Sequence, residues 1–417
     1  MWGRKNEIHN LRQTRRDLRG DMNFVGQHYY QVNRILLEIL GLWPYNNSIF
    51  IRIYRVSMLT VFVSSSITQF AKLHDTISDL DRFLYNLTYA VPSLIYILRF
   101  VTYITSGKQL RQLLDRIQHD WNTFKDGEER KIIRCSAITG MQCTIFAYVV
   151  TFIPLFGYIV TLYIPTFLDF VRPLNESRPR KLPILSEYFF LDEQEYYYPM
   201  LVHHSMVIGI GITLVISTEA MLMVFIQHGC GLFEVISYRL KHAFDEHETS
   251  CMPNMSDREK YSMIHSKITE AVIIHKRAIE FLDRFKLAFN SSYSIMLILG
   301  IVTITINMYR LLRALEMMND WEELMASGIF VLGQYGYLFG VNYFGQKLNN
   351  YSIRMFNMTY EAFWYTAPIQ AQKILIFILQ KMMKGYALNI SNIGIIIASL
   401  ETFASVTIYF LQFQTNN

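Results

Sequence analysis

Apolar stretches long enough to cross a bilayer alternate with polar segments along the whole chain. A helix needs about 20 apolar residues to span the hydrocarbon core. Glycine and proline occur within several stretches, where neighbouring helices can satisfy the freed backbone groups. The pattern predicts seven membrane-spanning helices. They cover Ile49–Leu73, Phe83–Ser106, Ile132–Ile164, Pro199–Gln227, Ala288–Met308, Glu323–Phe344 and Asn389–Phe413.

The composition agrees with a membrane protein. Of 417 residues, 52% are hydrophobic and only 18% are charged, whereas soluble domains carry roughly 25% charged residues. So few charges cannot cover several water-facing surfaces, and we expect part of the surface to face lipid. The net charge of +5 comes from basic residues in the connections, with no basic and aromatic patch of the kind that binds nucleic acid.

Basic residues are divided unequally between the two sets of connections. The N-terminal segment and the connections after the second, fourth and sixth spans hold 27 Lys and Arg, against 8 in the opposite set. Since basic residues favour the cytosolic side, we predict a cytosolic N-terminus and an extracellular C-terminus. G-protein-coupled receptors have the reverse orientation, which argues against that class. The cysteines fall outside the predicted outer loops, and we expect them to be reduced; they are Cys135, Cys143, Cys230 and Cys251.

Amphipathic segments on the predicted cytosolic side point to further helices. Apolar positions recur at helical spacing from Asp257 to Lys286, and we expect this helix to continue directly into the fifth span. The fourth span is likewise expected to continue inward through Gly231–Phe244, and Ile369–Lys384 forms another amphipathic stretch. Exposing such stripes costs roughly 25 cal/mol per Å². We therefore predict that they pack against each other or another subunit in a cytosolic anchor bundle.

These patterns define an all-α, polytopic membrane protein and divide the chain into six parts. The parts are 1–48, a cytosolic N-terminal segment; 49–228, transmembrane helices one to four; 229–287, a cytosolic helical extension; 288–345, transmembrane helices five and six; 346–388, the cytosolic anchor helix region; and 389–417, the seventh helix with an extracellular tail.

Catalytic chemistry has no basis in the spans. There is no nucleotide-binding glycine-rich loop, no His-Glu-x-x-His motif and no carboxylate pair at membrane depth, so we expect neither an enzyme nor a cofactor. Five potential metal ligands lie close together but lack a zinc spacing, and we predict no metal site there. They are His242, Asp245, Glu246, His247 and Cys251.

Glu219 is a carboxylate within an apolar stretch, near its inner end. We predict that it snorkels or is paired, rather than forming an ion site. A secondary transporter remains an alternative from a different class. Internal repeats or paired broken helices would indicate one, and the two halves of this chain show no such similarity.

Short motifs in a fixed order resemble those of the insect odorant receptors. Gly41-Leu42-Trp43-Pro44 precedes the first span, as a Gly-hydrophobe-Trp-Pro segment does in that family. The last quarter of the chain resembles the family's C-terminal signature. The matching segments are Gly345-Gln346-Lys347-Leu348, Tyr360, Trp364-Tyr365, Lys373-Ile374-Leu375-Ile376-Phe377, Ser399-Leu400-Glu401-Thr402-Phe403 and Tyr409-Phe410.

The resemblance implies an odorant-binding subunit of a ligand-gated, non-selective cation channel in the plasma membrane of sensory-neuron dendrites. It also implies a small volatile hydrophobic ligand and a heterotetramer with an obligate odorant receptor co-receptor. The connection between the fourth and fifth spans is short, as in a ligand-tuning subunit, whereas the co-receptor has a long connection there. Near the C-terminus, four residues also resemble the closing residues of gustatory receptors; they are Thr407, Tyr409, Gln412 and Phe413. A gustatory-type channel therefore remains an alternative.

The resemblance implies that the seventh helix lines a central pore. An apolar stripe can gate ions by dewetting, and without carboxylates it should select weakly among cations; packing against a neighbouring helix is the other interpretation. The pore-facing positions are Ile393, Ile397, Leu400, Ala404, Ile408, Leu411 and Gln412.

The resemblance places the ligand in the outer half of the bundle, among helices two to six. Aromatic residues with a few polar groups suit a small volatile molecule, although any one of them can instead be a packing residue or an interface anchor. The candidates are Tyr85, Thr88, Tyr89, Tyr148, Phe152, Phe156, His203, Val207, Phe330 and Gln334. Asn175, in the long predicted outer loop, is the expected glycosylation site.

Overall fold

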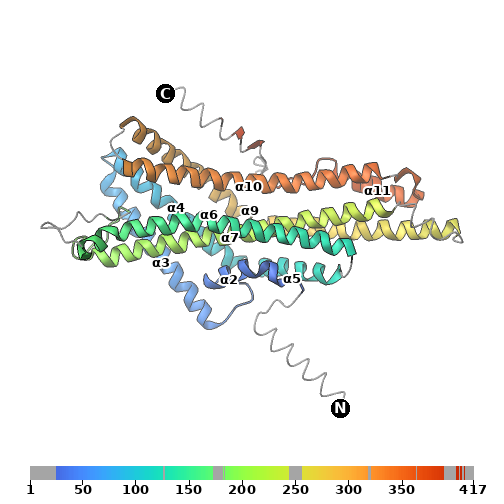
Figure 1. Ribbon diagram of the computed structural model, residues 1–417, viewed down its shortest axis with the longest axis horizontal. Helices are drawn as coiled ribbons and strands as arrows, with labels where there is room; N and C mark the ends of the chain where they lie inside the picture. The colour runs from blue at the N-terminus through green and yellow to red at the C-terminus, as the bar shows by residue number, and fades with distance from the viewer. Residues whose placement is uncertain are drawn as a thin grey trace, which may run out of the picture.

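The computed structural model describes residues 25–124, 127–171, 182, 184–243, 256–317, 321–362 and 364–388, with 401, 402, 404, 405 and 408. Long helices run lengthwise through an elongated bundle (Figure 1). The six longest are α3 (Ile49–Thr76), α4 (Leu80–Thr105), α6 (Gly127–Val171), α7 (Tyr197–Ala243), α9 (Asp257–Met317) and α10 (Trp321–Glu361). The shorter elements are η1 (Gln27–Tyr30), α2 (Gln31–Ile39), α5 (Gly107–Thr123), η2 (Trp364–Thr366) and α11 (Ile369–Met382).

Each of the six long helices is long and apolar enough to cross a membrane. They correspond to the first six predicted spans, whereas most of the seventh, Asn389–Phe413, lies outside the described residues. The outer face of α6 is apolar: Phe146 is 69% exposed and Ile153 68%. Such side chains are stable in contact with lipid, which confirms the polytopic membrane fold.

The Gly-Leu-Trp-Pro segment forms the turn between α2 and α3. Gly41 has φ +68°, a left-handed conformation that glycine adopts without steric cost. Its N–H donates to the Glu38 carbonyl at 2.9 Å, and the Leu42 N–H donates to the Leu37 carbonyl at 2.7 Å. This is the Schellman arrangement that ends helices. Trp43 is then buried, so the motif fixes the direction in which the chain enters the first span.

Helix α7 is the central helix of the bundle and packs against α3, α4, α6, α9 and α10. It runs without interruption for 47 residues, and α9 runs for 61. The prediction that the fourth and fifth spans continue into adjoining amphipathic helices is therefore confirmed. In Figure 1 both helices extend well beyond the region around α3 and α4 to the end where α11 lies.

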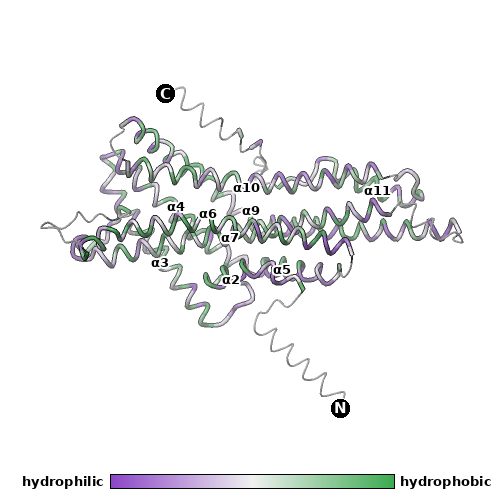
Figure 2. The backbone as a smooth tube through the Cα atoms, in the orientation of Figure 1, coloured by the Kyte–Doolittle hydropathy of each residue, from purple (hydrophilic) through white to green (hydrophobic). Residues whose placement is uncertain are grey.

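The amphipathic stripes pack against each other at that end. Ile268, Ala278 and Phe281 of α9 are no more than 1% exposed, and α11 packs against both α9 and α10. Figure 2 shows many hydrophilic residues on α5 and on the far ends of α7 and α9. The predicted burial of the stripes is confirmed, while the cytosolic location of this bundle stays a prediction.

Helix α5 is an element that the sequence analysis did not identify. It occupies the connection between the second and third spans and packs against α9. Its aliphatic positions follow helical spacing and are all fully buried; they are Leu110, Leu113, Leu114 and Ile117.

Candidate ligand site and a buried ion pair network

An aromatic cluster joins α4 and α10 near their predicted outer ends. The Tyr85 and Tyr89 rings, one turn apart on α4, have centroids 5.5 Å apart. The Phe330 ring of α10 stands edge-on to Tyr89, with 5.4 Å between centroids. The Tyr158 side chain of α6 lies close enough to Tyr85 and Tyr89 to interact electrostatically with both. Three predicted ligand residues, Tyr85, Tyr89 and Phe330, are therefore brought together. We name them, together with Tyr158, the outer aromatic cluster.

Arg310 of α9 lies against this cluster. Its guanidinium carbon is 4.6 Å from the Tyr85 ring centroid, a distance at which the cation is attracted to the ring. The Nε atom donates to Glu323 Oε1 at 2.8 Å, and Nη2 is 2.5 Å from the same oxygen. Arg310 is 5% exposed. Arg310 falls in the predicted connection after the fifth span and was not among the predicted ligand residues.

Other predicted ligand residues lie on α6 and α7, at two separate positions. The Tyr148 and Phe152 rings stack with centroids 5.2 Å apart, and the Tyr148 hydroxyl lies 2.5 Å from Ser217 Oγ. The two His203 nitrogens lie 3.1 Å from Ser64 Oγ and 2.8 Å from the Tyr188 hydroxyl. This histidine links α7 to α3 and to the segment before α7.

The remaining predicted ligand residues differ in their surroundings. Val207 and Thr88 are buried, and the Thr88 hydroxyl donates to the Leu84 carbonyl of its own helix at 3.1 Å. Gln334 is half-buried, and its Oε1 has no hydrogen-bond partner. Phe156 is 71% exposed on α6, so the structure does not bring its side chain to the others.

Farther along α4 a buried ion pair connects four helices. Arg99 of α4 forms an ion pair with Glu219 of α7, and the two side chains are 3% and 8% exposed. Tyr293 of α9 and Tyr337 of α10 both donate to Glu219 Oε1, at 2.8 and 3.0 Å. The same guanidinium donates to Thr218 Oγ1 at 2.9 Å and faces both tyrosine rings. A charged pair at membrane depth is costly unless it is paired and hydrogen-bonded, as it is here.

Of the two alternatives predicted for Glu219, snorkelling or pairing, the structure shows the paired carboxylate. Its partner Arg99 was not identified, although both residues lie near the inner ends of their predicted spans. Ten residues separate Arg99 from Tyr89, so the pair lies about 15 Å deeper than the outer aromatic cluster. The network therefore lies between that cluster and the extended ends of α7 and α9.

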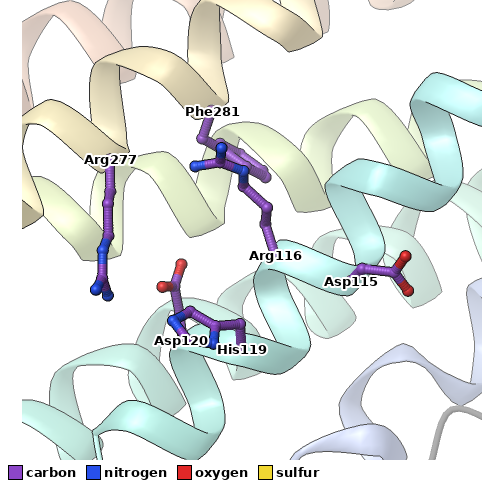
Figure 3. Close-up of a pocket in the computed structure, with 6 residues that line it drawn as sticks. All are labelled: Asp115, Arg116, His119, Asp120, Arg277 and Phe281. Carbon is purple, nitrogen blue, oxygen red and sulfur yellow. The ribbon is translucent and has the colours of Figure 1, made fainter.

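Two pockets lie outside the outer aromatic cluster, and no predicted ligand residue lines either. One, of about 360 Å³, is formed by α5 and α9 (Figure 3); it is lined by Asp115, Arg116, His119, Asp120, Arg277 and Phe281. The other, of about 340 Å³, is formed by η1 and α2. In the first, Asp120 Oδ2 is 3.0 Å from Nε2 of the buried His228 of α7. Opposite charges line this pocket in equal number, which does not suit a charged ligand.

The segment just before the predicted seventh span is tied to the bundle. The Tyr386 hydroxyl donates to Asp283 Oδ1 of α9 at 2.9 Å, and its backbone N–H donates to Ser352 Oγ of α10 at 2.6 Å. Burial, together with the Asp283 carboxylate, raises the pKa of the Tyr386 phenol above its ordinary value. The Tyr386 hydroxyl therefore stays a hydrogen-bond donor at all physiological pH values.

Most of the predicted pore-facing residues lie outside the described part of the chain. Ala404 and Ile408 are described, and both are helical and exposed. Of the possible metal ligands only His242 is described; its Nδ1 lies 2.9 Å from the Tyr238 carbonyl oxygen. Asn175 is also outside the described residues.

The long apolar helices and the aromatic cluster, in which Tyr89 is buried and the other three residues are half-buried, are typical of a multi-pass membrane receptor for small molecules. The sequence model of the 7tm Odorant receptor family matches residues 79–408. The chain belongs to this family. Membership confirms the predicted resemblance to odorant receptors, and it also confirms that the chain is a receptor and not an enzyme.

Solved structures of insect olfactory receptors share this fold. The olfactory receptor OR5 from Machilis hrabei in complex with eugenol matches with a TM-score of 0.70 at 13% identity, over 94% of this chain and 98% of that one. A second structure of the same receptor matches with a TM-score of 0.70 at 14% identity, over 93% and 96% of the two chains. A search of curated proteins finds no match.

Proposed function

We propose that the chain is the odorant-binding subunit of a ligand-gated, non-selective cation channel that it forms with an odorant receptor co-receptor. The observation that carries the proposal is the outer aromatic cluster, built by α4, α6 and α10 within an odorant receptor fold. The Machilis hrabei receptor of that fold was solved in complex with eugenol, a small aromatic molecule. We propose the plasma membrane of sensory-neuron dendrites as its location.

The proposed ligand is a small, volatile, mainly apolar molecule in contact with this cluster. Binding gains free energy from apolar burial and from edge-to-face contacts with the aromatic rings. A ligand between α4 and α10 changes the separation of two helices that also hold Arg99 and Tyr337 of the ion pair network. Because the network joins α4, α7, α9 and α10, the proposed gating movement passes through it to the extended helices.

Whole-cell recording tests the proposal. We expect cation current evoked by a broad volatile panel in cells that express this chain with an insect odorant receptor co-receptor. Neither chain alone should give the same responses. Current from this chain alone would favour the gustatory-type homomeric channel instead. Substrate uptake without ionic current would identify a transporter, and either result contradicts the proposal.

The proposed topology predicts one glycosylated asparagine. Asn175 lies in the loop that the basic residues place outside, whereas Asn254 and Asn357 begin sequons on the opposite side. Endoglycosidase treatment should increase the electrophoretic mobility of the chain, and Asn175→Gln should abolish this shift. Asn254→Gln serves as the control and should leave the shift unchanged. A shift that depends on Asn254 or Asn357 would reverse the proposed orientation.

A further inference from the structure

Two nitrogens of the Arg310 guanidinium, Nη1 and Nη2, are buried and make no hydrogen bond. Nε donates to Glu323 Oε1, and Nη2 forms an ion pair with the same oxygen. A buried donor left unsatisfied is unfavourable, and native structures rarely keep one unless a water or a ligand accepts from it. Arg310 therefore presents Nη1 as a free, charged N–H donor inside a buried part of the bundle.

This donor is next to the outer aromatic cluster. The guanidinium carbon lies 4.6 Å from the Tyr85 ring centroid, and the charge of Arg310 also acts on Tyr89. Phe330 completes the apolar side of the same cluster through its contact with Tyr89. A ligand held by these rings would bring its polar atom within reach of Nη1. Small-molecule sites have this composition, with many apolar walls and one or two fixed polar groups.

The charge of the pair decides which polar atom fits. Arg310 and Glu323 together are neutral, so a carboxylate ligand would add an uncompensated negative charge to a buried site, which is costly. A neutral carbonyl oxygen accepts a hydrogen bond from Nη1 and adds no charge. It also brings no hydrogen of its own that would need an acceptor.

We propose that this receptor selects neutral volatile carbonyl compounds, such as ketones, aldehydes and esters, through a hydrogen bond from Arg310 Nη1 to the carbonyl oxygen. The inference rests on the proposed odorant-binding function. It assigns the polar contact of the site to a residue of α9, while the rings of α4, α6 and α10 hold the apolar part of the ligand. A hydrocarbon cannot accept a hydrogen bond from Nη1 and leaves this charged donor unpaired. It should therefore bind less well than the carbonyl compound.

Matched ligands test the inference in cells that express the chain with the co-receptor. Two series share a skeleton and differ in the polar group: acetophenone, ethylbenzene and benzoate, and heptanal, heptane and heptanoate. The carbonyl member should be effective at a concentration at least about tenfold lower than the hydrocarbon or the carboxylate, as expected for one charge-assisted hydrogen bond. If the hydrocarbon or the carboxylate is equally or more effective in both series, the inference is overturned.

A double variant tests the residue. Arg310→Met with Glu323→Gln removes the donor without leaving a buried charge, and it should abolish the preference for the carbonyl member over the hydrocarbon. The control is Arg313→Met with Asp81→Asn, which removes the neighbouring and more exposed ion pair, with N–O distance 3.0 Å, and should retain the preference. Retention of the preference in the Arg310 variant would overturn the inference.

A binding measurement that does not depend on channel opening distinguishes a failure of this inference from a failure of the proposed function. Acetophenone, but not ethylbenzene, should raise the thermal unfolding temperature of the purified chain in detergent, and the Arg310 variant should lose the difference. If co-expressing cells give no odorant current although the chain reaches the surface, the channel proposal fails. The thermal shift then still decides whether Arg310 recognises a carbonyl group: equal shifts with the two ligands overturn the inference.

Discussion

Arg99→Met alone should destabilise the chain by about 3–5 kcal/mol, because it leaves the Glu219 carboxylate buried without its cation. The Arg99 and Glu219 side chains are only 3% and 8% exposed, so water cannot replace the lost contact. Thermal unfolding of the detergent-purified chain should shift to lower temperature, and the amount of chain at the cell surface should fall. This is the largest effect that we expect from a single substitution.

A double variant controls for the loss of arginine itself. Arg99→Met with Glu219→Gln removes both charges and keeps the side chains similar in volume, so it should recover most of the lost stability. The recovered chain should then show altered odorant sensitivity if the network carries the gating movement. A single variant as stable as the unchanged chain would mean that the ion pair does not hold the four helices together.

Gly211→Ala should destabilise the chain by about 1–3 kcal/mol through overpacking. A Cβ at this position would come closer than 3.0 Å to ring carbons of Tyr96 on α4. That ring cannot easily move away, because it packs against Phe62 of α3 with 5.8 Å between centroids. The substitution should therefore push α7 away from α4, and thermal unfolding measures the loss.

Gly209, two residues earlier on the same helix, provides the matched control. A Cβ there would meet nothing within 4 Å, and alanine favours the helix over glycine by up to about 1 kcal/mol. Gly209→Ala should therefore leave the stability unchanged or raise it. Equal losses from the two substitutions would show that glycine flexibility, and not the contact with Tyr96, is the property that matters.

The hydrophobic pattern was sufficient to predict the long helices, because each membrane span needs a long apolar stretch. It was not sufficient for α5, which has 17 residues and lies in a charged connection. Its signal was nevertheless present, since Leu110, Leu113, Leu114 and Ile117 follow the spacing of one helix face. The pairing of Arg99 with Glu219 could not be predicted in the same way. The two residues are 120 positions apart, and one sequence does not show which helices are neighbours.

The sequence predicted only part of the candidate site, and the reason lies in the geometry of the α-helix. Tyr148, Phe152 and Phe156 are each four residues apart, but four residues make slightly more than one helical turn, so each step rotates by about 40°. Phe156 is therefore turned away from Tyr148 by about 80°, and Pro154 lies between Phe152 and Phe156. Tyr148 meets Ser217 of α7, whereas Phe156 is exposed.

The length of α9 would let a tilt of the helix reach both of its ends. Its 61 residues extend about 90 Å at 1.5 Å per residue, about three times the thickness of the hydrocarbon core. No proline interrupts it. Arg310 lies near one end, Tyr293 of the ion pair network lies in the central part, and Asp283, which holds Tyr386, lies ten residues beyond. A rigid rod of this length, tilted by about one degree around its midpoint, moves each end by about 0.8 Å. A ligand that displaces the Arg310 end of α9 would therefore move the opposite end by a similar distance.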